Sequence, residues 1–114
     1  MLAPDTPPAR LAAHAAHAAG VLKILANAQR LRLLCHLAAG EMAVGQLVDR
    51  SGLSQSSVSQ HLGRLRDGGL VATRRDGTTI FYRLANEDVH QLIDVLCQRF
   101  GPPASPASFD GMPS

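Results

Sequence analysis

The chain has 114 residues, of which 46% are hydrophobic, 18% charged and 4% aromatic, with no Trp. This length favours one domain with a mostly aliphatic core, and the composition excludes a disordered or collagen-like chain. Eleven Lys and Arg against nine Asp and Glu give a net charge of +2, which indicates nucleic-acid binding only if the basic residues cluster.

The two ends of the chain are rich in proline. Residues 1–8 hold three of the seven Pro and residues 101–114 hold the other four, so we expect flexible tails around a working domain at residues 9–100. The first residues lack the basic and apolar segments of a secretory signal, and no apolar run is long enough to span a membrane. We therefore expect a cytoplasmic protein.

Three helices are predicted in the first half of the chain. Residues 10–26 are rich in Ala and Leu and apolar on nearly all sides, which favours a helix buried in its own core or against a partner subunit. Residues 28–39 place apolar side chains at helical spacing and end at Gly40. Residues 44–50 form a short third helix, which Ser51 and Gly52 close.

A fourth helix has one thin apolar stripe. Ser54 is a candidate N-cap, and residues 55–66 follow it with Val58, Leu62 and Leu65 at helical spacing and almost everything else polar or small. One side of this helix therefore faces the core, and a broad polar side remains. The sequence Asp-Gly-Gly at residues 67–69 ends the helix.

A hairpin and a last helix complete the domain. Residues 70–75 and 78–84 are strand-like runs around Asp76 and Gly77, a dipeptide typical of two-residue hairpin turns. Asn86 is expected to cap a final helix over residues 87–100. The order of elements predicts a mainly α fold with a β-hairpin wing, namely a winged helix-turn-helix.

The outer side of the fourth helix is suited to DNA. In a helix-turn-helix the second helix enters the major groove, where amides read adenine, Arg reads guanine, and small hydroxyls let the backbone approach phosphate. An ordinary solvated helix would mix Glu with Lys and Arg, whereas residues 55–66 contain no acid. The candidate DNA-binding residues on and before this helix are Ser54, Gln55, Ser56, Ser57, Ser59, Gln60, His61 and Arg64.

The predicted wing carries further basic residues. Arg74 and Arg75 precede the turn and Arg83 follows it, so two or three guanidinium groups lie along the hairpin. They are candidates for contacts with the phosphate backbone or the minor groove. The alternative is a charged edge that only prevents aggregation.

The motifs together resemble the ArsR/SmtB family of winged-helix repressors. The resemblance rests on residues 22–34, 44–47, 54–62, 65–71 and 81–84 and covers residues 20–100. It implies a homodimer built from the first and last helices, binding to a palindromic operator in double-stranded DNA, and release when an inducer binds. An apolar stripe from Val89 to Phe100 agrees with a dimer surface.

The metal sites known in this family are incomplete here. Residues 41–47 contain no thiol, so the metalloid site of the family's founding type is absent. Asp88 and His90 match the first half of the family's zinc site, but Gly101 and Ala104 stand where its other ligands belong. We therefore predict no metal cofactor; the alternative is an unusual site that recruits His14 or His17.

The two cysteines resemble those of the family's persulfide-sensing SqrR/BigR/HlyU branch. Cys35 matches the first cysteine of that branch, whereas Cys97 lies one helical turn before the second, which would fall near Gly101. The resemblance implies a thiol sensor for reactive sulfur or oxidant at Cys35 and Cys97. Two alternatives stay open: cysteines that only pack in the core, and a winged helix that binds protein instead of DNA. No motif of an enzyme is present.

Overall fold

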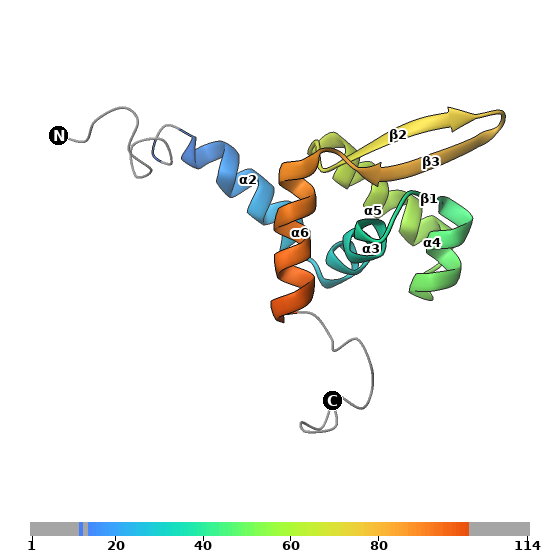
Figure 1. Cartoon of the computed structure of the whole chain (residues 1–114), viewed down its shortest axis with the longest axis horizontal. Helices are drawn as coiled ribbons and strands as arrows, with labels where there is room; N and C mark the ends of the chain where they lie inside the picture. Colours follow the sequence, from blue (N-terminus) through green and yellow to red (C-terminus); the bar gives the residue numbers. More distant parts are fainter. Residues whose placement is uncertain (1–11, 13, 101–114) are drawn as a thin grey trace, which may run out of the picture.

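The computed structural model describes residue 12 and residues 14–100, so both predicted tails lie outside the described residues (Figure 1). The predicted winged helix-turn-helix, mainly helical with a β-hairpin wing, is confirmed. Its elements are helices α2 (Ala15–Leu25), α3 (Ala28–Ala38), α4 (Val44–Ser51), α5 (Gln55–Asp67) and α6 (Glu87–Phe100), and strands β1 (Met42–Ala43), β2 (Val71–Asp76) and β3 (Thr79–Leu84).

Side-chain caps set the beginnings of three helices. Asn27 Oδ1 accepts a hydrogen bond from the Arg30 amide at 3.0 Å at the start of α3. The two predicted caps are confirmed, because Ser54 Oγ accepts from an amide of the first turn of α5 at 3.0 Å and Asn86 Oδ1 does the same for α6 at 2.9 Å. Each cap satisfies an amide that has no partner within its helix.

The hydrophobic core surrounds α3, which lies in the middle of the domain (Figure 1). Leu33 and Leu34 are completely buried, and they meet the apolar stripe of α5 and the inner side of α6. Ile93 is the fully buried residue of α6. The core consists of Leu25, Leu33, Leu34, Leu37, Met42, Leu47, Val58, Leu62, Leu65, Leu70, Val71, Leu84 and Ile93.

Helix α2 differs from its prediction. Of its residues only Leu25 is buried, and Leu22 keeps 62% of its surface exposed. The helix runs from the core toward the N-terminal end of the described chain, with its first turns clear of the other elements (Figure 1). The expectation that this helix is buried within its own domain is therefore wrong. Among the described residues, the core covers only the end of the helix, through Leu25 with Val21 and Ile24 packed beside it.

The sheet contains one strand that the sequence analysis missed. Strand β1 pairs with β3 through Met42 and Ala43, which gives an antiparallel sheet in the order β1-β3-β2. Two residues are too few to show an alternating pattern. The hairpin turn also lies one residue later than predicted, because Asp76 pairs with Thr79 and leaves Gly77 at the first central position, with φ of 64°. A glycine is favoured there because it adopts positive φ without strain.

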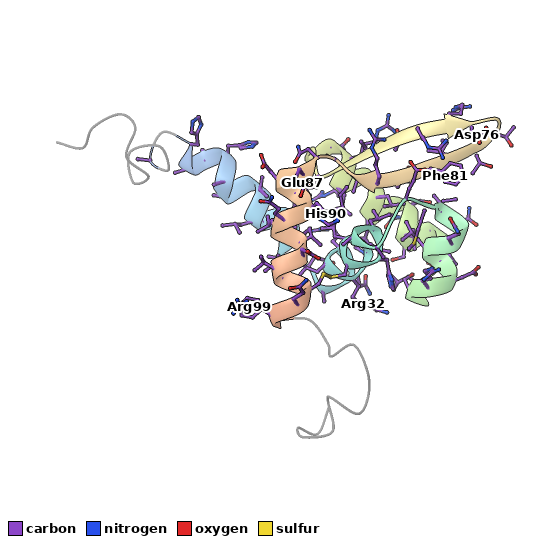
Figure 2. The ribbon with its side chains drawn as sticks, viewed as in Figure 1. Arg32, Asp76, Phe81, Glu87, His90 and Arg99 are labelled. Atoms are coloured by element: carbon purple, nitrogen blue, oxygen red, sulfur yellow. A yellow bond between two sulfur atoms is a disulfide. The ribbon has the colours of Figure 1, made fainter. Side chains whose placement is uncertain are left out.

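The wing is attached to the body of the domain through Arg74. Its Nε lies 2.8 and 2.9 Å from the two carboxylate oxygens of Glu41, and its Nη2 lies 2.7 Å from Oε1. The guanidinium also covers the ring of Phe81, its partner across the hairpin, at 4.6 Å from the centroid. Figure 2 shows Phe81 between the body and Asp76, which lies near the far end of the wing. Arg74 thus joins β2, β3 and the segment before β1.

We predict that Glu41→Gln loosens the wing, because the Arg74 guanidinium loses its carboxylate partner. Amide hydrogen exchange over residues 72–82 should become faster, while exchange in the core of α3 stays unchanged. Asp76→Asn removes an acid near the turn without touching this contact and serves as the control. Equal exchange in Glu41→Gln and in the wild type would show that strand pairing alone holds the wing.

Candidate nucleic-acid interface and thiol site

Helices α4 and α5 and the turn between them form the helix-turn-helix. Gly52 ends α4 in the left-handed conformation, with φ of 74°. The Ser51 side chain is buried and its Oγ accepts from the Leu53 amide at 3.2 Å. From α3, Arg32 Nη2 donates to the Ser51 carbonyl at 2.7 Å, which satisfies a carbonyl at the negative end of α4. The turn is therefore fixed from both sides.

Helix α5 turns one side toward the core and offers the other to a partner. Val58, Leu62 and Leu65 are fully buried. At 100° per residue, Ser56 and Gln60 lie opposite this stripe and point away from the domain. The predicted DNA-binding residues of this segment that are exposed are Ser54, Gln55, Ser56, Ser59, Gln60 and Arg64.

Two candidate residues lie at the border of this surface. Ser57 is half-buried and supplies the amide that Ser54 caps. His61 is also half-buried, and its Nε2 is hydrogen-bonded to Gln29 Oε1 of α3 at 2.8 Å. Burial and then the charge of Arg30 lower the pKa of His61, which favours its neutral form. Both residues are therefore tied to the domain itself.

Arg30 is a further basic residue at this surface that the sequence analysis did not assign to it. It lines a shallow hollow of about 460 Å³ together with Gln60, His61, Gly63, Arg64 and Asp67. Its Nε donates to the Ile24 carbonyl at 2.7 Å, which holds the side chain beside α5. This position of Arg30 could not be predicted from the sequence, because the packing of α3 against α5 depends on the tertiary structure.

The arginines of the wing point to different sides. Strand residues alternate between faces and paired residues share one, so Arg74 and Arg83 lie on one face and Arg75 lies on the other. All three are exposed, but Arg74 is paired with Glu41. Within the described part of the chain, Arg75 makes no ion pair. The sequence pattern alone did not distinguish these roles.

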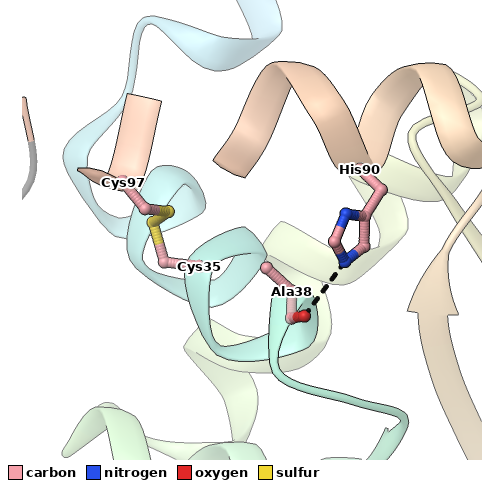
Figure 3. The surroundings of a disulfide bond; sticks show 4 residues. All are labelled: Cys35, Ala38, His90 and Cys97. Atoms are coloured by element: carbon pink, nitrogen blue, oxygen red, sulfur yellow. Dashed lines mark hydrogen bonds between the residues drawn. A yellow bond between two sulfur atoms is a disulfide. The ribbon is translucent and has the colours of Figure 1, made fainter. Parts of the chain in front are cut away.

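Cys35 and Cys97 are joined by a disulfide bond (Figure 3). Their Cα atoms are 6.1 Å apart, within the usual range for a disulfide. The bond links the middle of α3 to the last turns of α6. A second contact joins the same helices, because His90 Nε2 lies 3.2 Å from the Ala38 carbonyl oxygen. The one-turn departure of Cys97 from the pattern of similar sensors therefore does not prevent bridging.

Arg30, Arg32 and Arg99 lie near the two cysteines in sequence, but they take different places around the disulfide. Arg32 lines the same pocket as Cys35. Arg30 does not line this pocket. It lies five residues before Cys35 on the same helix, so its side chain is rotated about 140° from that of Cys35 and lies toward α5. Arg99 points away from α3 (Figure 2). Of these three guanidinium groups, that of Arg32 is therefore the one beside the disulfide.

The structure shows where the possible metal ligands lie. Among residue 12 and residues 14–100, no three His, Cys, Asp or Glu side chains gather closely enough to hold a metal ion. His90 contacts the Ala38 carbonyl oxygen, and His14 is exposed before α2. Asp88 and His17 line a hollow between α2 and α6.

None of the helices among residue 12 and residues 14–100 has both the length and the hydrophobicity that a membrane span requires.

Comparison with known proteins gives the family. Residues 27–73 match the family model described as bacterial regulatory protein, arsR family. The chain is 55% identical over 73 residues to the HTH-type transcriptional regulator KmtR of Mycobacterium tuberculosis, covering 64% of this chain and 56% of KmtR. It is 46% identical over 83 residues to the transcriptional activator HlyU of Vibrio cholerae, covering 73% of this chain and 77% of HlyU.

Solved structures of similar proteins share the fold. Reduced HlyU of V. cholerae has a TM-score of 0.74 and 41% identity, over 82% of this chain and 98% of that one. The transcriptional repressor BigR of Xylella fastidiosa has a TM-score of 0.76 and 38% identity, over 86% of this chain and 100% of that one. The homodimeric winged helix-turn-helix DNA-binding domain of Mb0332 from Mycobacterium bovis has a TM-score of 0.70 and 40% identity, over 83% of this chain and 86% of that one. The chain therefore belongs to the ArsR family of bacterial regulatory proteins.

Proposed function

We propose that this protein is a homodimeric transcriptional repressor that binds a palindromic operator and is released by chemistry at Cys35 and Cys97. The surface of α5 is the observation that carries the proposal. It presents exposed amide, hydroxyl and guanidinium groups opposite a fully buried stripe, beside a wing whose strands carry exposed arginines. BigR is named a repressor and HlyU an activator, so repression, as opposed to activation, is part of what we propose for this chain.

Base contacts and phosphate contacts are assigned to different residues. Gln60 and Arg64 lie on the exposed side of α5 and suit direct contact with base edges, with Ser54, Gln55, Ser56 and Ser59 allowing close approach. Arg75 on the wing suits a phosphate, because its guanidinium is exposed and makes no ion pair in the described part of the chain. Ser57, His61 and Arg74 act mainly by positioning these groups.

We predict that Gln60→Ala and Arg64→Ala each reduce the preference for operator over random DNA by about 1–3 kcal/mol. Arg75→Ala should weaken binding to both DNAs together and lower the slope of the salt dependence by about 1, because a phosphate contact carries no sequence information. Competition binding with operator and random duplexes at several salt concentrations measures both effects. Unchanged operator preference in the two α5 variants would contradict the assignment of the recognition helix.

The dimer surface is assigned to α2 and α6. These helices adjoin at a hollow lined by Val21 and Leu92, and two apolar residues of the same helices, Leu22 and Val95, expose 62% and 51% of their surfaces. Exposed apolar side chains on neighbouring helices favour an interface, and a second copy would bury them symmetrically. Ile93 belongs to the stripe from Val89 to Phe100 that the sequence analysis offered for this role, but it is fully buried in its own core. The interface is therefore assigned to Leu92 and its exposed neighbours.

We predict that Leu92→Asp yields a monomer that no longer binds the palindromic operator, because a buried carboxylate opposes association. Two recognition helices must lie about 34–36 Å apart to reach successive major grooves, and one protomer supplies a single helix. Sedimentation velocity at micromolar concentration measures the association. Ile80→Asp, at an exposed apolar residue on the wing, is the control and should remain dimeric. A dimeric Leu92→Asp protein would place the interface elsewhere.

The disulfide joins the two functional parts of the domain. Helix α6 carries the proposed dimer surface, and α3 holds the turn before α5 through Arg32 and Ser51. A bond between α3 and α6 therefore fixes the recognition unit relative to the dimer. Forming it from two thiols removes two electrons and two protons, which an oxidant accepts. In a persulfide route, a persulfide donor transfers its outer sulfur to one cysteine and leaves as a thiol. The other cysteine then attacks the inner sulfur, which forms the disulfide and releases hydrogen sulfide.

We predict that oxidant or a persulfide donor releases the wild-type protein from DNA, whereas Cys35→Ser and Cys97→Ser each stay bound. A coupling free energy of about 1–3 kcal/mol between formation of the disulfide and the orientation of the recognition helices corresponds to a change of about 5- to 150-fold in the affinity for the operator. Fluorescence anisotropy of labelled operator, before and after treatment and again after dithiothreitol, measures the switch. Equal release of both variants and the wild type would leave the cysteines as packing residues.

A further inference from the structure

A pocket of about 500 Å³ lies beside the disulfide, between α3, α4 and the end of α6. It is away from the exposed side of α5 and shares no residue with the proposed DNA contacts. Its walls are mostly apolar, and three basic side chains line it as well. The residues around it are Ala28, Leu31, Arg32, Cys35, His36, Arg50, Leu96 and Phe100. Its volume lies in the range typical of pockets that bind small molecules.

Two arginines make this pocket positively charged. Arg32 and Arg50 have no carboxylate within 4.0 Å among the described residues, and no Asp or Glu lines the pocket. Both guanidinium groups act on His36, because burial first and then Arg32 and Arg50 lower its pKa. The two charges therefore converge on one place, and His36 adds a neutral ring.

We propose that this pocket binds a small organic anion, a carboxylate or sulfonate carried on an apolar body. The anionic group would pair with Arg50 and with the free donors of Arg32, since a guanidinium has five N–H groups and Ser51 accepts from one nitrogen. The apolar body would lie against Leu31, Leu96 and Phe100, removing their surfaces from water. This inference rests on the proposed function only for its regulatory meaning.

A ligand in this pocket affects the proposed thiol switch because it covers the part of the pocket wall that contains Cys35. Cys35 is part of the lining, so a bound molecule stands between the sulfur–sulfur bond and a reductant that approaches from this side. Thiol–disulfide exchange requires a thiolate to reach one sulfur directly. The ligand therefore protects the oxidised form and prolongs the released state of the repressor.

Paired probes test the recognition of the anion. Isothermal titration of the oxidised full chain with decanoate should show one site per chain, and decanol, of equal length and without charge, should bind about tenfold more weakly. Arg50→Gln and Arg32→Gln should each lower the affinity for decanoate by a similar factor. Arg75→Gln, which removes an exposed charge from the wing, should bind decanoate as the wild type does. Equal affinity for decanoate and decanol, several sites per chain, or wild-type affinity in both pocket variants would overturn the proposal.

A second measurement tests the protection of the bond. The rate at which dithiothreitol reduces the disulfide should fall when decanoate saturates the wild type, and should fall less in Arg50→Gln at the same decanoate concentration, because that variant is only partly occupied. An unchanged rate in the saturated wild type would refute the shielding. Binding of the operator is measured separately, with no decanoate present. A protein that binds decanoate but not the operator would contradict the proposed function alone. A protein that binds the operator but not decanoate would contradict the proposal for the pocket alone.

Discussion

The fold depends on the burial of the leucines of α3. Leu33, Leu34 and Leu37 occupy the centre of a domain that has few aromatic residues, so aliphatic packing must supply most of its stability. A helix with a buried centre contacts neighbours on several sides. Helices α5 and α6 and strand β3 all pack against α3, and each carries one part of the proposed function. Helix α3 is therefore the shared frame of recognition helix, wing and dimer surface.

Helix α6 has two sides with separate roles. Ile93 packs into the core and Cys97 is bonded to Cys35, while Leu92 and Val95 remain exposed. A change in how α6 sits on α3 would therefore alter the surface offered to a second copy. His90 and Cys97 join α6 to α3 at points two turns apart, one through a hydrogen bond and the other through the disulfide. The disulfide therefore lies between the core helix and the surface that we propose for the dimer.

The arginines show how one residue type takes different roles. Arg64 and Arg75 are exposed and suited to DNA, whereas Arg74 is held by Glu41 and stiffens the wing. Arg30 and Arg32 lie on one helix and each donates to a main-chain carbonyl, yet one adjoins α5 and the other lines the pocket at the disulfide. A guanidinium has enough donors to hold a carbonyl and still meet an anion. The small net charge of the chain therefore conceals two separate basic surfaces.

The sequence by itself determined the elements and their order, because their signals are local. The caps Ser54 and Asn86, the stripe of Val58, Leu62 and Leu65, and the strand pattern around Gly77 each lie within one element. Only the tertiary structure decided which exposed groups are available, because that depends on contacts between distant residues. The Glu41 and Arg74 pair joins residues 33 apart, and the disulfide joins residues 62 apart. Neither the two-residue strand β1 nor the exposure of α2 could be read locally, because pairing and burial are supplied by the rest of the chain.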